Sequence, residues 1–271
     1  MEYKLIVFDL DDTLAVTGEA ILRQDTELLK IIEKTGINIA ICSGKPVYYL
    51  CGFMRQTGLN NAIMVGENGA VTQFGIALPP RKFIFTPHSI EADKEIVFLK
   101  KKFDERIPNI WYQPNQVGLT PFPKDEEEFR IIQECIDENK SSIEHLTVYR
   151  HADSFDITPS GITKYTGLKQ LGEIINVKPE ETIAVGDGVN DYPMFDYAGY
   201  SVGVHVKQPE AVNINFPTVT EALYHIIEII YRIFLLKIIE IHVWKVYIYN
   251  IKNERNFDFV YLCTCGSQRN G

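Results

Sequence analysis

The sequence predicts an α/β domain built on a doubly wound parallel sheet, with a second, smaller α+β domain inserted into it. Short runs rich in Ile and Val alternate with helical patterns along most of the chain, and one middle stretch breaks the alternation. Glycine or polar residues bound each run, as expected for strands buried on both faces of a parallel sheet. The five runs are residues 3–10, 37–43, 62–67, 182–187 and 200–204.

The intervals between these runs carry helical patterns. The patterns begin at Asp25, Pro46, Ile162 and Asn190. The first two end at a glycine that follows a basic or polar last turn, which is a common signal for the end of a helix. Strands that alternate with helices favour a sheet covered on both faces, and such sheets bind ligands outside the carboxyl ends of their strands.

The stretch from about residue 79 to residue 159 follows a different order. It reads as strand, helix, two strands, helix and two strands, and prolines separate its pieces: Pro79, Pro80, Pro121, Pro123 and Pro159. We therefore predict that residues 80–158 form the inserted α+β domain and that residues 1–79 and 159–230 form the core.

Several side chains of the predicted insertion are expected to serve packing rather than ligand binding. Trp111, Tyr112 and Phe122 are expected in its hydrophobic core, because large rings contribute most when they are buried. Arg150 and His151 lie at the end of a predicted strand, where a core or surface role is favoured over contact with a ligand.

Residues 231–271 continue past the last helix predicted for the core as a C-terminal extension whose structure the sequence does not define. The apolar run over residues 226–251 is long enough to cross a membrane, but charged residues interrupt it at several depths, and each would be costly in the bilayer. These residues are Glu228, Arg232, Lys237, Glu240 and Lys245. We therefore expect no membrane anchor. The pair Cys263 and Cys265 lacks partner ligands at the spacing of a metal site.

The composition argues for an ordinary globular protein and against a binder of nucleic acid. The 271 residues are 45% hydrophobic and 23% charged, and the formal net charge is -9. Binding to nucleic acid depends largely on Lys and Arg that neutralise phosphates. Five cysteines without a framework spacing favour reduced thiols, and no secretory signal pattern opens the sequence. Together these features predict a cytoplasmic location.

Three carboxylates crowd the end of the first predicted strand. Asp9, Asp11 and Asp12 follow the apolar residues 5–8 directly, with Leu10 between them. Acidic residues in such a position often cap a helix or form a turn. A chemical role is favoured only if other polar groups meet them at the same edge of the sheet.

Further polar clusters fall at comparable positions. "CSGK" at residues 42–45 follows the second strand, "GITKY" places Lys164 near the start of a helix, and "GDGVND" at residues 186–191 follows another strand. Because parallel strands end at one edge of the sheet, the fold gathers these clusters there. The combined carboxylates, hydroxyl and ammonium groups suit phosphoryl transfer, in which a divalent cation and fixed positive charge allow a carboxylate to approach a phosphate. Closely placed carboxylates favour Mg²⁺.

With these four motifs in this order, the chain resembles the haloacid dehalogenase-like phosphatase superfamily over residues 1–230. The glycine-flanked "GENGA" at residues 66–70 and the position of the insertion resemble the Cof-type and sucrose-phosphatase-like branch, which carries an α/β cap. One position departs from that branch, whose second motif more commonly ends in arginine. Lys45 stands there and offers a point charge in place of a bidentate fork.

The resemblance implies a catalytic set. Asp9 would be the nucleophile and Asp11 the general acid and base. Ser43 and Gly44 would bind the phosphate. Lys164 would also bind it and would stabilise the aspartyl-phosphate.

The resemblance also implies a Mg²⁺ site. Asp9, Asp187 and the backbone carbonyl of Asp11 would hold the ion. Asn190 and Asp191 would support that site, with Asp191 orienting Lys164 or a metal-bound water.

The expected function is therefore that of a Mg²⁺-dependent phosphatase that hydrolyses a small phosphorylated metabolite, such as a sugar phosphate or phosphoglycolate, through an aspartyl-phosphate. A phosphosugar mutase with the same intermediate is the nearest alternative. A phospho-acceptor signalling domain shares the acidic cluster, hydroxyl and lysine, but it needs about half this length and no insertion. A P-type pump would require several membrane spans. The sequence leaves the oligomeric state open.

Overall fold

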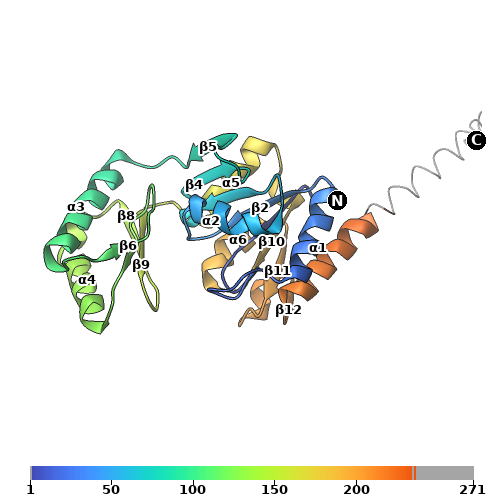
Figure 1. Cartoon of the computed structure of the whole chain (residues 1–271). Helices are drawn as coiled ribbons and strands as arrows, with labels where there is room; N and C mark the ends of the chain where they lie inside the picture. The colour runs from blue at the N-terminus through green and yellow to red at the C-terminus, as the bar shows by residue number, and fades with distance from the viewer. Residues whose placement is uncertain (1, 234, 236–271) are drawn as a thin grey trace, which may run out of the picture. The chain divides into compact units, whose positions relative to one another are not determined.

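The computed structural model describes residues 2–233 and 235, and its largest element is an eight-stranded sheet in the order β12-β11-β10-β1-β2-β3-β4-β5 (Figure 1). The parallel strands are β1 (Leu5–Phe8), β2 (Asn38–Cys42), β3 (Ile63–Gly66), β10 (Thr182–Gly186), β11 (Tyr200–Val204) and β12 (Ile214–Phe216). From β1 the chain builds outward to β2 and β3 on one side and to β10, β11 and β12 on the other. Such a switch point is where open α/β sheets bind their ligands.

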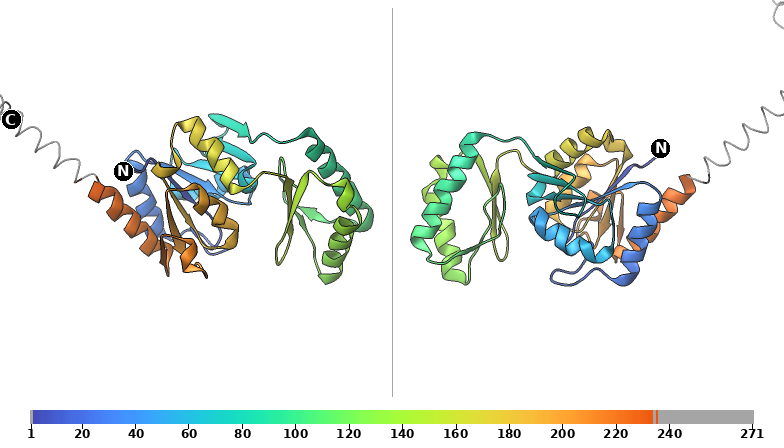
Figure 2. Two further views of the ribbon diagram at one scale, coloured as in Figure 1. Left: turned by 180° about the vertical axis from the view of Figure 1, so that it is seen from behind. Right: turned by 45° about the horizontal axis from the view of Figure 1, so that its top comes forward.

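Helices cover both faces of the sheet, which explains the continuous apolar runs in its strands. Every residue of β1 is buried. Leu5 and Val7 belong to a cluster with side chains of α5 (Lys164–Ile175) and α6 (Tyr192–Tyr197). Figure 2 shows α1 (Arg23–Lys34) and α2 (Val47–Met54) on the opposite face. The predicted doubly wound fold is confirmed.

The sheet differs from the prediction at one edge, where β4 (Val71–Phe74) and β5 (Lys82–Phe85) run antiparallel. A turn at Glu67–Gly69 joins β3 to β4. A connection this short can join only antiparallel neighbours. Since β5 pairs with β4, residues 82–85, which were predicted to lie at the start of the insertion, extend the main sheet.

Residues 90–159, which we call the cap, form a smaller α+β arrangement. Two helices, α3 (Ile90–Arg106) and α4 (Glu126–Glu138), share a hydrophobic cluster with two hairpins. The hairpins pair β6 (Trp111–Tyr112) with β7 (Pro121–Phe122) and β8 (Leu146–Arg150) with β9 (Phe155–Pro159). Leu119 and Ile157 exchange backbone hydrogen bonds of 2.9 and 3.0 Å, which join the hairpins. After β5, the order of elements is the predicted one.

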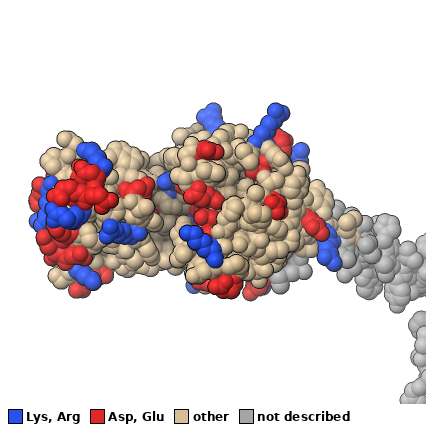
Figure 3. Space-filling view, turned by 90° about the horizontal axis from the view of Figure 1, so that it is seen from below, with Lys and Arg blue, Asp and Glu red and all other residues tan. Residues whose placement is uncertain are grey.

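The exposed sides of the two cap helices are rich in charge of both signs, and Figure 3 shows these side chains intermixed at the left of the molecule. Neighbours one turn apart form ion pairs, such as Lys100 with Asp104 at 2.8 Å and Arg130 with Glu127 at 2.6 Å. Such exposed pairs contribute little each, roughly 0.3–0.5 kcal/mol. These surface charges are therefore solvated and add little to the stability of the cap.

Residues 1–227 form one compact unit and residues 228–271 a second, of which 228–233 and 235 are described. The division of the first unit into separate core and inserted domains stays a prediction. The predicted extension at residues 231–271 lies almost entirely outside the described residues. Among the helices that the structure describes, none combines enough length with enough hydrophobicity to span a bilayer.

Candidate active site

The predicted motifs meet at the carboxyl ends of three adjacent strands. Phe8 in β1 lies beside Ile41 in β2 and Val185 in β10. Asp9 and Ser43 directly follow β1 and β2, and Asp187 directly follows β10. The backbone continues this register, because the N–H group of Asp9 donates to the carbonyl oxygen of Val185 at 2.9 Å. The strand register therefore brings carboxylates and a hydroxyl group to one edge of the sheet.

Lys164 joins two of the carboxylates. Its Nζ atom donates to Oδ1 of Asp9 and to Oδ1 of Asp191, at 2.6 Å in each case. The side chain is only 2% exposed. Lys164 is the first residue of α5, and Thr163 caps that helix by accepting from the backbone N–H of Thr166. The cap fixes where the helix begins and hence where the ammonium group lies.

The ion pairs set the charge of this lysine. Burial by itself would lower the pKa of Lys164, but Asp191 and Asp9 outweigh burial and hold the pKa above its ordinary value. A buried charge persists only when it is paired and hydrogen-bonded. Lys164 is therefore a fixed positive charge beside Asp9.

Asp191 is held by the turn in which it lies. Its Oδ2 atom accepts from the backbone N–H groups of Asp187 and Gly188, at 2.9 and 3.2 Å. A Cβ atom at Gly186 would lie 2.5 Å from the same oxygen, so glycine is required there. Asp191 is fully buried, whereas its neighbour Asn190 is exposed. The structure thus brings Asp191 into the network and leaves Asn190 at its surface.

Three carboxylates lie near Lys164, so one positive charge offsets only part of their negative charge. Oxygens of Asp9, Asp187 and Asp191 lie within 4.8 Å of one another. Burial, reinforced by Asp191, raises the pKa of Asp9 to about 8 and that of Asp187 to about 6. Thr13 Oγ1 donates to Oδ1 of Asp187 at 3.1 Å and fixes its orientation. Hard divalent cations prefer such oxygen ligands, so these residues fit Mg²⁺.

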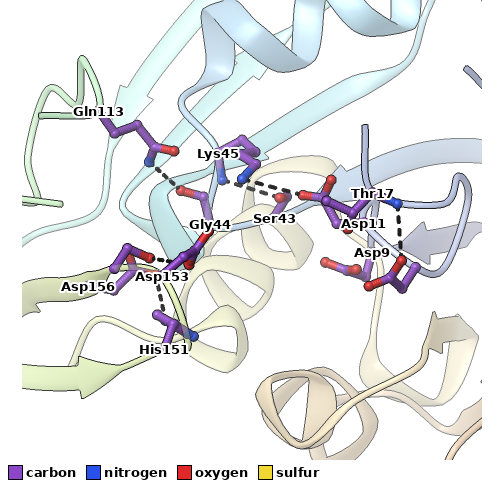
Figure 4. A network of polar contacts seen from close by, with 12 residues as sticks. Asp9, Asp11, Thr17, Ser43, Gly44, Lys45, Gln113, His151, Asp153 and Asp156 are labelled. Carbon is purple, nitrogen blue, oxygen red and sulfur yellow. Dashed lines mark hydrogen bonds and ion pairs between the residues drawn. The ribbon is translucent and has the colours of Figure 1, made fainter. Parts of the chain in front are cut away.

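The three aspartates at the end of β1 divide between chemistry and turn formation. Asp12 has a φ of 60°, and its Oδ1 accepts from the backbone N–H of Thr17 at 3.0 Å, so it closes the loop. Asp11 is instead directed to the second motif, with Oδ2 at 3.8 Å from Nζ of Lys45 (Figure 4). Asp12 therefore forms the turn, whereas Asp9 and Asp11 face polar groups of the other motifs.

The second motif forms a compact loop after β2. Ser43 is buried, and its Oγ accepts from the backbone N–H of Lys45 at 3.2 Å, which leaves the hydroxyl proton free to donate. The carbonyl oxygen of Gly44 accepts from Nε2 of Gln113 in the cap at 3.0 Å (Figure 4). A Cβ atom at Gly44 would stand 3.3 Å from Oδ2 of Asp156, also in the cap. The cap therefore lies directly over this loop.

A buried glutamate that was not singled out from the sequence also binds the cap. Glu67 is 1% exposed, and its carboxylate accepts from three successive backbone N–H groups, those of residues 116, 117 and 118, at 2.8, 2.9 and 3.1 Å. Its neighbour Asn68 donates through Nδ2 to Oδ2 of Asp156 at 2.9 Å. The motif "GENGA" draws attention to this position, but the sequence alone does not reveal that the partner of Glu67 lies about 50 residues further along the chain.

Three aromatic residues of the cap were expected in its hydrophobic core, and one of them is exposed instead. Tyr112 packs against the cap cluster as expected, and its hydroxyl donates to Asp104 at 2.8 Å. Trp111 is 56% exposed and borders a cavity together with Asp11 and Lys45. Side chains alternate along a strand, so the neighbour of the half-buried Tyr112 points to the opposite face. The predicted burial is wrong for Trp111.

A comparison with known proteins agrees with this geometry. The family model of the haloacid dehalogenase-like hydrolases matches residues 6–120 and 83–221. The chain belongs to this family. Two relatives, each 24% identical, are phosphoglycolate phosphatases: that of Methanococcoides burtonii aligns over 78% of this chain and 88% of its own length, and that of Staphylothermus marinus over 85% and 97%.

Solved structures of the same family share the fold. A haloacid dehalogenase-like hydrolase from Bacteroides thetaiotaomicron superposes with a TM-score of 0.69 at 21% identity, covering 83% of this chain and 100% of that one. A sugar phosphatase of subclass IIB superposes with a TM-score of 0.62 at 21% identity, covering 82% and 98%. The family assignment made from the four motifs is confirmed.

Proposed function

We propose that this chain is a Mg²⁺-dependent phosphatase that hydrolyses a small phosphorylated metabolite through an aspartyl-phosphate on Asp9. The observation that carries the proposal is the buried network in which Lys164 holds Asp9 and Asp191 beside Asp187. The phosphatases among its relatives support the same reaction class. Sugar phosphates, phosphoglycolate and similar esters are the candidate substrates.

Asp9 is suited to act as the nucleophile. Lys164 holds Oδ1 of Asp9, which leaves Oδ2 to attack phosphorus. A bond forms between this oxygen and phosphorus while the bond from phosphorus to the leaving oxygen breaks. Asp11 gives its proton to the leaving oxygen. Lys164 offsets the negative charge on the phosphoryl group, and the Ser43 hydroxyl donates to one of its oxygens.

The second half of the reaction releases inorganic phosphate. Asp11, now a carboxylate, takes a proton from a water molecule, and the water oxygen attacks phosphorus. The bond between Asp9 and phosphorus then breaks, and the carboxylate of Asp9 is restored. Asp9, Asp187 and the backbone carbonyl of Asp11 would hold Mg²⁺. When bound, the ion would offset the crowded negative charge and keep Asp9 ionised.

Two alternatives are weaker. A phosphosugar mutase would use the same first step, but the relatives named above are phosphatases. A phospho-acceptor signalling domain would have no use for a cap that donates hydrogen bonds to the phosphate-binding loop, as Gln113 does here.

The test is phosphate release from a panel of phosphomonoesters, measured with Mg²⁺ and again after chelation by EDTA. We expect turnover of at least one ester, lost with the metal and restored when Mg²⁺ is added back. Activity that persists in EDTA would contradict the metal dependence. A complete absence of release across a panel that includes sugar phosphates and phosphoglycolate would contradict the phosphatase itself.

A further inference from the structure

The face of the cap strands that is turned away from the cap helices carries exposed rings. Tyr112 faces α3, where its ring lies 4.3 Å from Nζ of Lys100. Its neighbours Trp111 and Gln113 must then point to the opposite face. Gln113 does so, since it donates to the carbonyl oxygen of Gly44 in the second motif. Trp111 is therefore directed toward the loop that follows β2.

Phe122 extends this aromatic surface. It lies opposite Trp111 in the hairpin register, and the two rings meet edge to face with centroids 5.1 Å apart. Directly opposed residues of an antiparallel pair share one face of the sheet. The exposed ring of Trp111 and the half-buried ring of Phe122 thus form a joined apolar surface.

These rings line a cavity that begins at the proposed proton donor. The cavity has a volume of about 690 Å³, and its lining includes Asp11, Lys45, Tyr48, Tyr49, Trp111 and Phe122. Trp111 is 56%, Tyr48 50% and Tyr49 44% exposed. Large rings exposed together, in a concave site with a few polar groups at one end, are typical of a binding pocket for a small molecule.

The position of Asp11 determines what this cavity would hold. A general acid must lie within hydrogen-bond reach of the leaving oxygen that it protonates. The carbon skeleton attached to that oxygen would then extend into the space that Asp11 borders. The occupant is therefore the leaving group of the substrate and not a second macromolecule.

The lining favours a ring over a short charged acid. Among the lining residues in the described part of the chain, Lys45 is the only cation, and it already lies 3.8 Å from Asp11. A carboxylate in the leaving group would have to share that lysine. Flat apolar surfaces instead match the face of a ring, either aromatic or that of a sugar.

We propose that the substrate is a phosphomonoester whose leaving group contains a ring, and that Trp111 determines this specificity by stacking against the ring. The inference rests on the proposed phosphatase function. The hydrogen bonds of Gln113 to Gly44 and of residues 116–118 to Glu67 hold this part of the cap on the loop, so Trp111 is positioned before the substrate arrives.

The experiment compares two substrate classes in four proteins. The ring esters are benzyl phosphate and a hexose 6-phosphate, and the acyclic esters are ethyl phosphate and 2-phosphoglycolate. The proteins are the full-length wild type, Trp111→Ala, Trp111→Phe and Tyr149→Ala. Tyr149 is a matched control: it is 44% exposed and lies opposite Asp156, hence on the same face of the cap strands, but it does not line the cavity.

We expect the wild type to prefer at least one ring ester over both acyclic esters in kcat/KM. Trp111→Ala should lower kcat/KM for that ester roughly tenfold, mainly by raising KM, because the ring does not touch the reacting atoms. The acyclic esters should change less than about threefold, and Trp111→Phe should restore part of the loss. Tyr149→Ala should behave as wild type. Whether the sugar or the benzyl ester is preferred then identifies the kind of ring.

Several results would overturn the inference while the phosphatase survives. These are a preference for acyclic esters, an equal loss on both classes in Trp111→Ala, or the same loss in Tyr149→Ala. Phosphate release from none of the esters would instead overturn the proposed function, and this inference with it. Melting temperatures of the four proteins separate any loss of fold from a loss of binding.

Discussion

Two groups of residues face each other, and they hold their positions by different means. One group lies at the carboxyl ends of β1, β2 and β10, and the other lies on the side of the cap that faces these strand ends. At the strand ends, charged groups are buried and paired with one another, as where Lys164 lies 2.6 Å from both Asp9 and Asp191. On the cap side, the residues that line the cavity are uncharged, as Gln113 and Trp111 are. On the proposed function, this difference would separate the chemistry that any phosphomonoester needs from the contacts that select one ester.

The two sides also differ in what a substitution costs. Removing one partner of a buried ion pair leaves an uncompensated charge, which costs about 3–5 kcal/mol. A single neutral hydrogen bond contributes about 0.5–1.5 kcal/mol net. Changes at the strand ends should therefore abolish function, whereas changes in the cap should shift stability or substrate preference.

The largest effect is expected from Asp9→Asn. The substitution keeps the volume of the side chain but removes the nucleophilic charge, so phosphate release should fall by about a thousandfold or more. Steady-state release of inorganic phosphate measures it, with the melting temperature as a check that the fold is retained. Turnover within a few-fold of wild type would show that Asp9 is not the nucleophile.

Asp187→Ala tests the metal side of the same cluster. Loss of the proposed ligand should raise the Mg²⁺ concentration for half-maximal rate by about tenfold or more, with a smaller change in the KM for substrate. The control is Asp12→Asn, since Asp12 serves the loop through the backbone of Thr17 and its amide keeps an acceptor oxygen. If the Mg²⁺ titration of Asp187→Ala matches that of the control, the ion lies elsewhere.

The positions of the site residues that follow the strands could be predicted from the sequence, because each of these residues comes directly after a strand. Asp9, Ser43 and Asp187 are fixed once the parallel register is known, and that register follows from apolar runs that alternate with helices. The roles assigned to these residues stay predictions. The reaction class was predicted in the same way, and the phosphatases among the relatives agree with it.

The cap half could not be predicted in the same way. Glu67 meets backbone groups, and backbone N–H groups have no signature in a sequence. Trp111 lies in a strand of two residues, too short for an alternating pattern to show which residue is buried. β5 was assigned to the insertion because local propensity identifies a strand without identifying the strand with which it pairs.

Glu67→Gln tests whether one carboxylate anchors the cap. An amide in place of the carboxylate would turn an NH₂ group toward donors at residues 116–118, and this mismatch should lower the free energy of unfolding by about 1–3 kcal/mol. Urea denaturation measures the change. Glu173→Gln is the control, because Glu173 lies exposed in α5. Equal stabilities of the two variants would mean that the three hydrogen bonds contribute little to holding the cap.

The smallest effect should come from His151 and its pH dependence. Nε2 of His151 lies 3.2 Å from Oδ2 of Asp156, and this hydrogen bond raises the pKa of His151 above its ordinary value. Burial alone would raise the pKa of Asp156, but its hydrogen bonds with His151 and Thr120 lower it. A histidine with a raised pKa in the folded state stabilises fully below its unfolded pKa of about 6.5, and that contribution is lost as pH rises through the folded value. Asp156 adds stability above its unfolded pKa and loses it only in acid.

The pair should therefore be intact at pH 6 and weakened at pH 8. His151 is 41% exposed, so solvent screening keeps its contribution below about 1 kcal/mol. Urea denaturation at both pH values should show a larger decline from pH 6 to pH 8 in the wild type than in His151→Gln, which cannot titrate. Asp156 also accepts from Asn68, which lies beside the second motif. A smaller decline in stability for His151→Gln would therefore indicate that the hydrogen bond between His151 and Asp156 helps to hold the cap on the sheet. Parallel pH profiles for the two proteins would show that the hydrogen bond does not contribute to holding the cap in place.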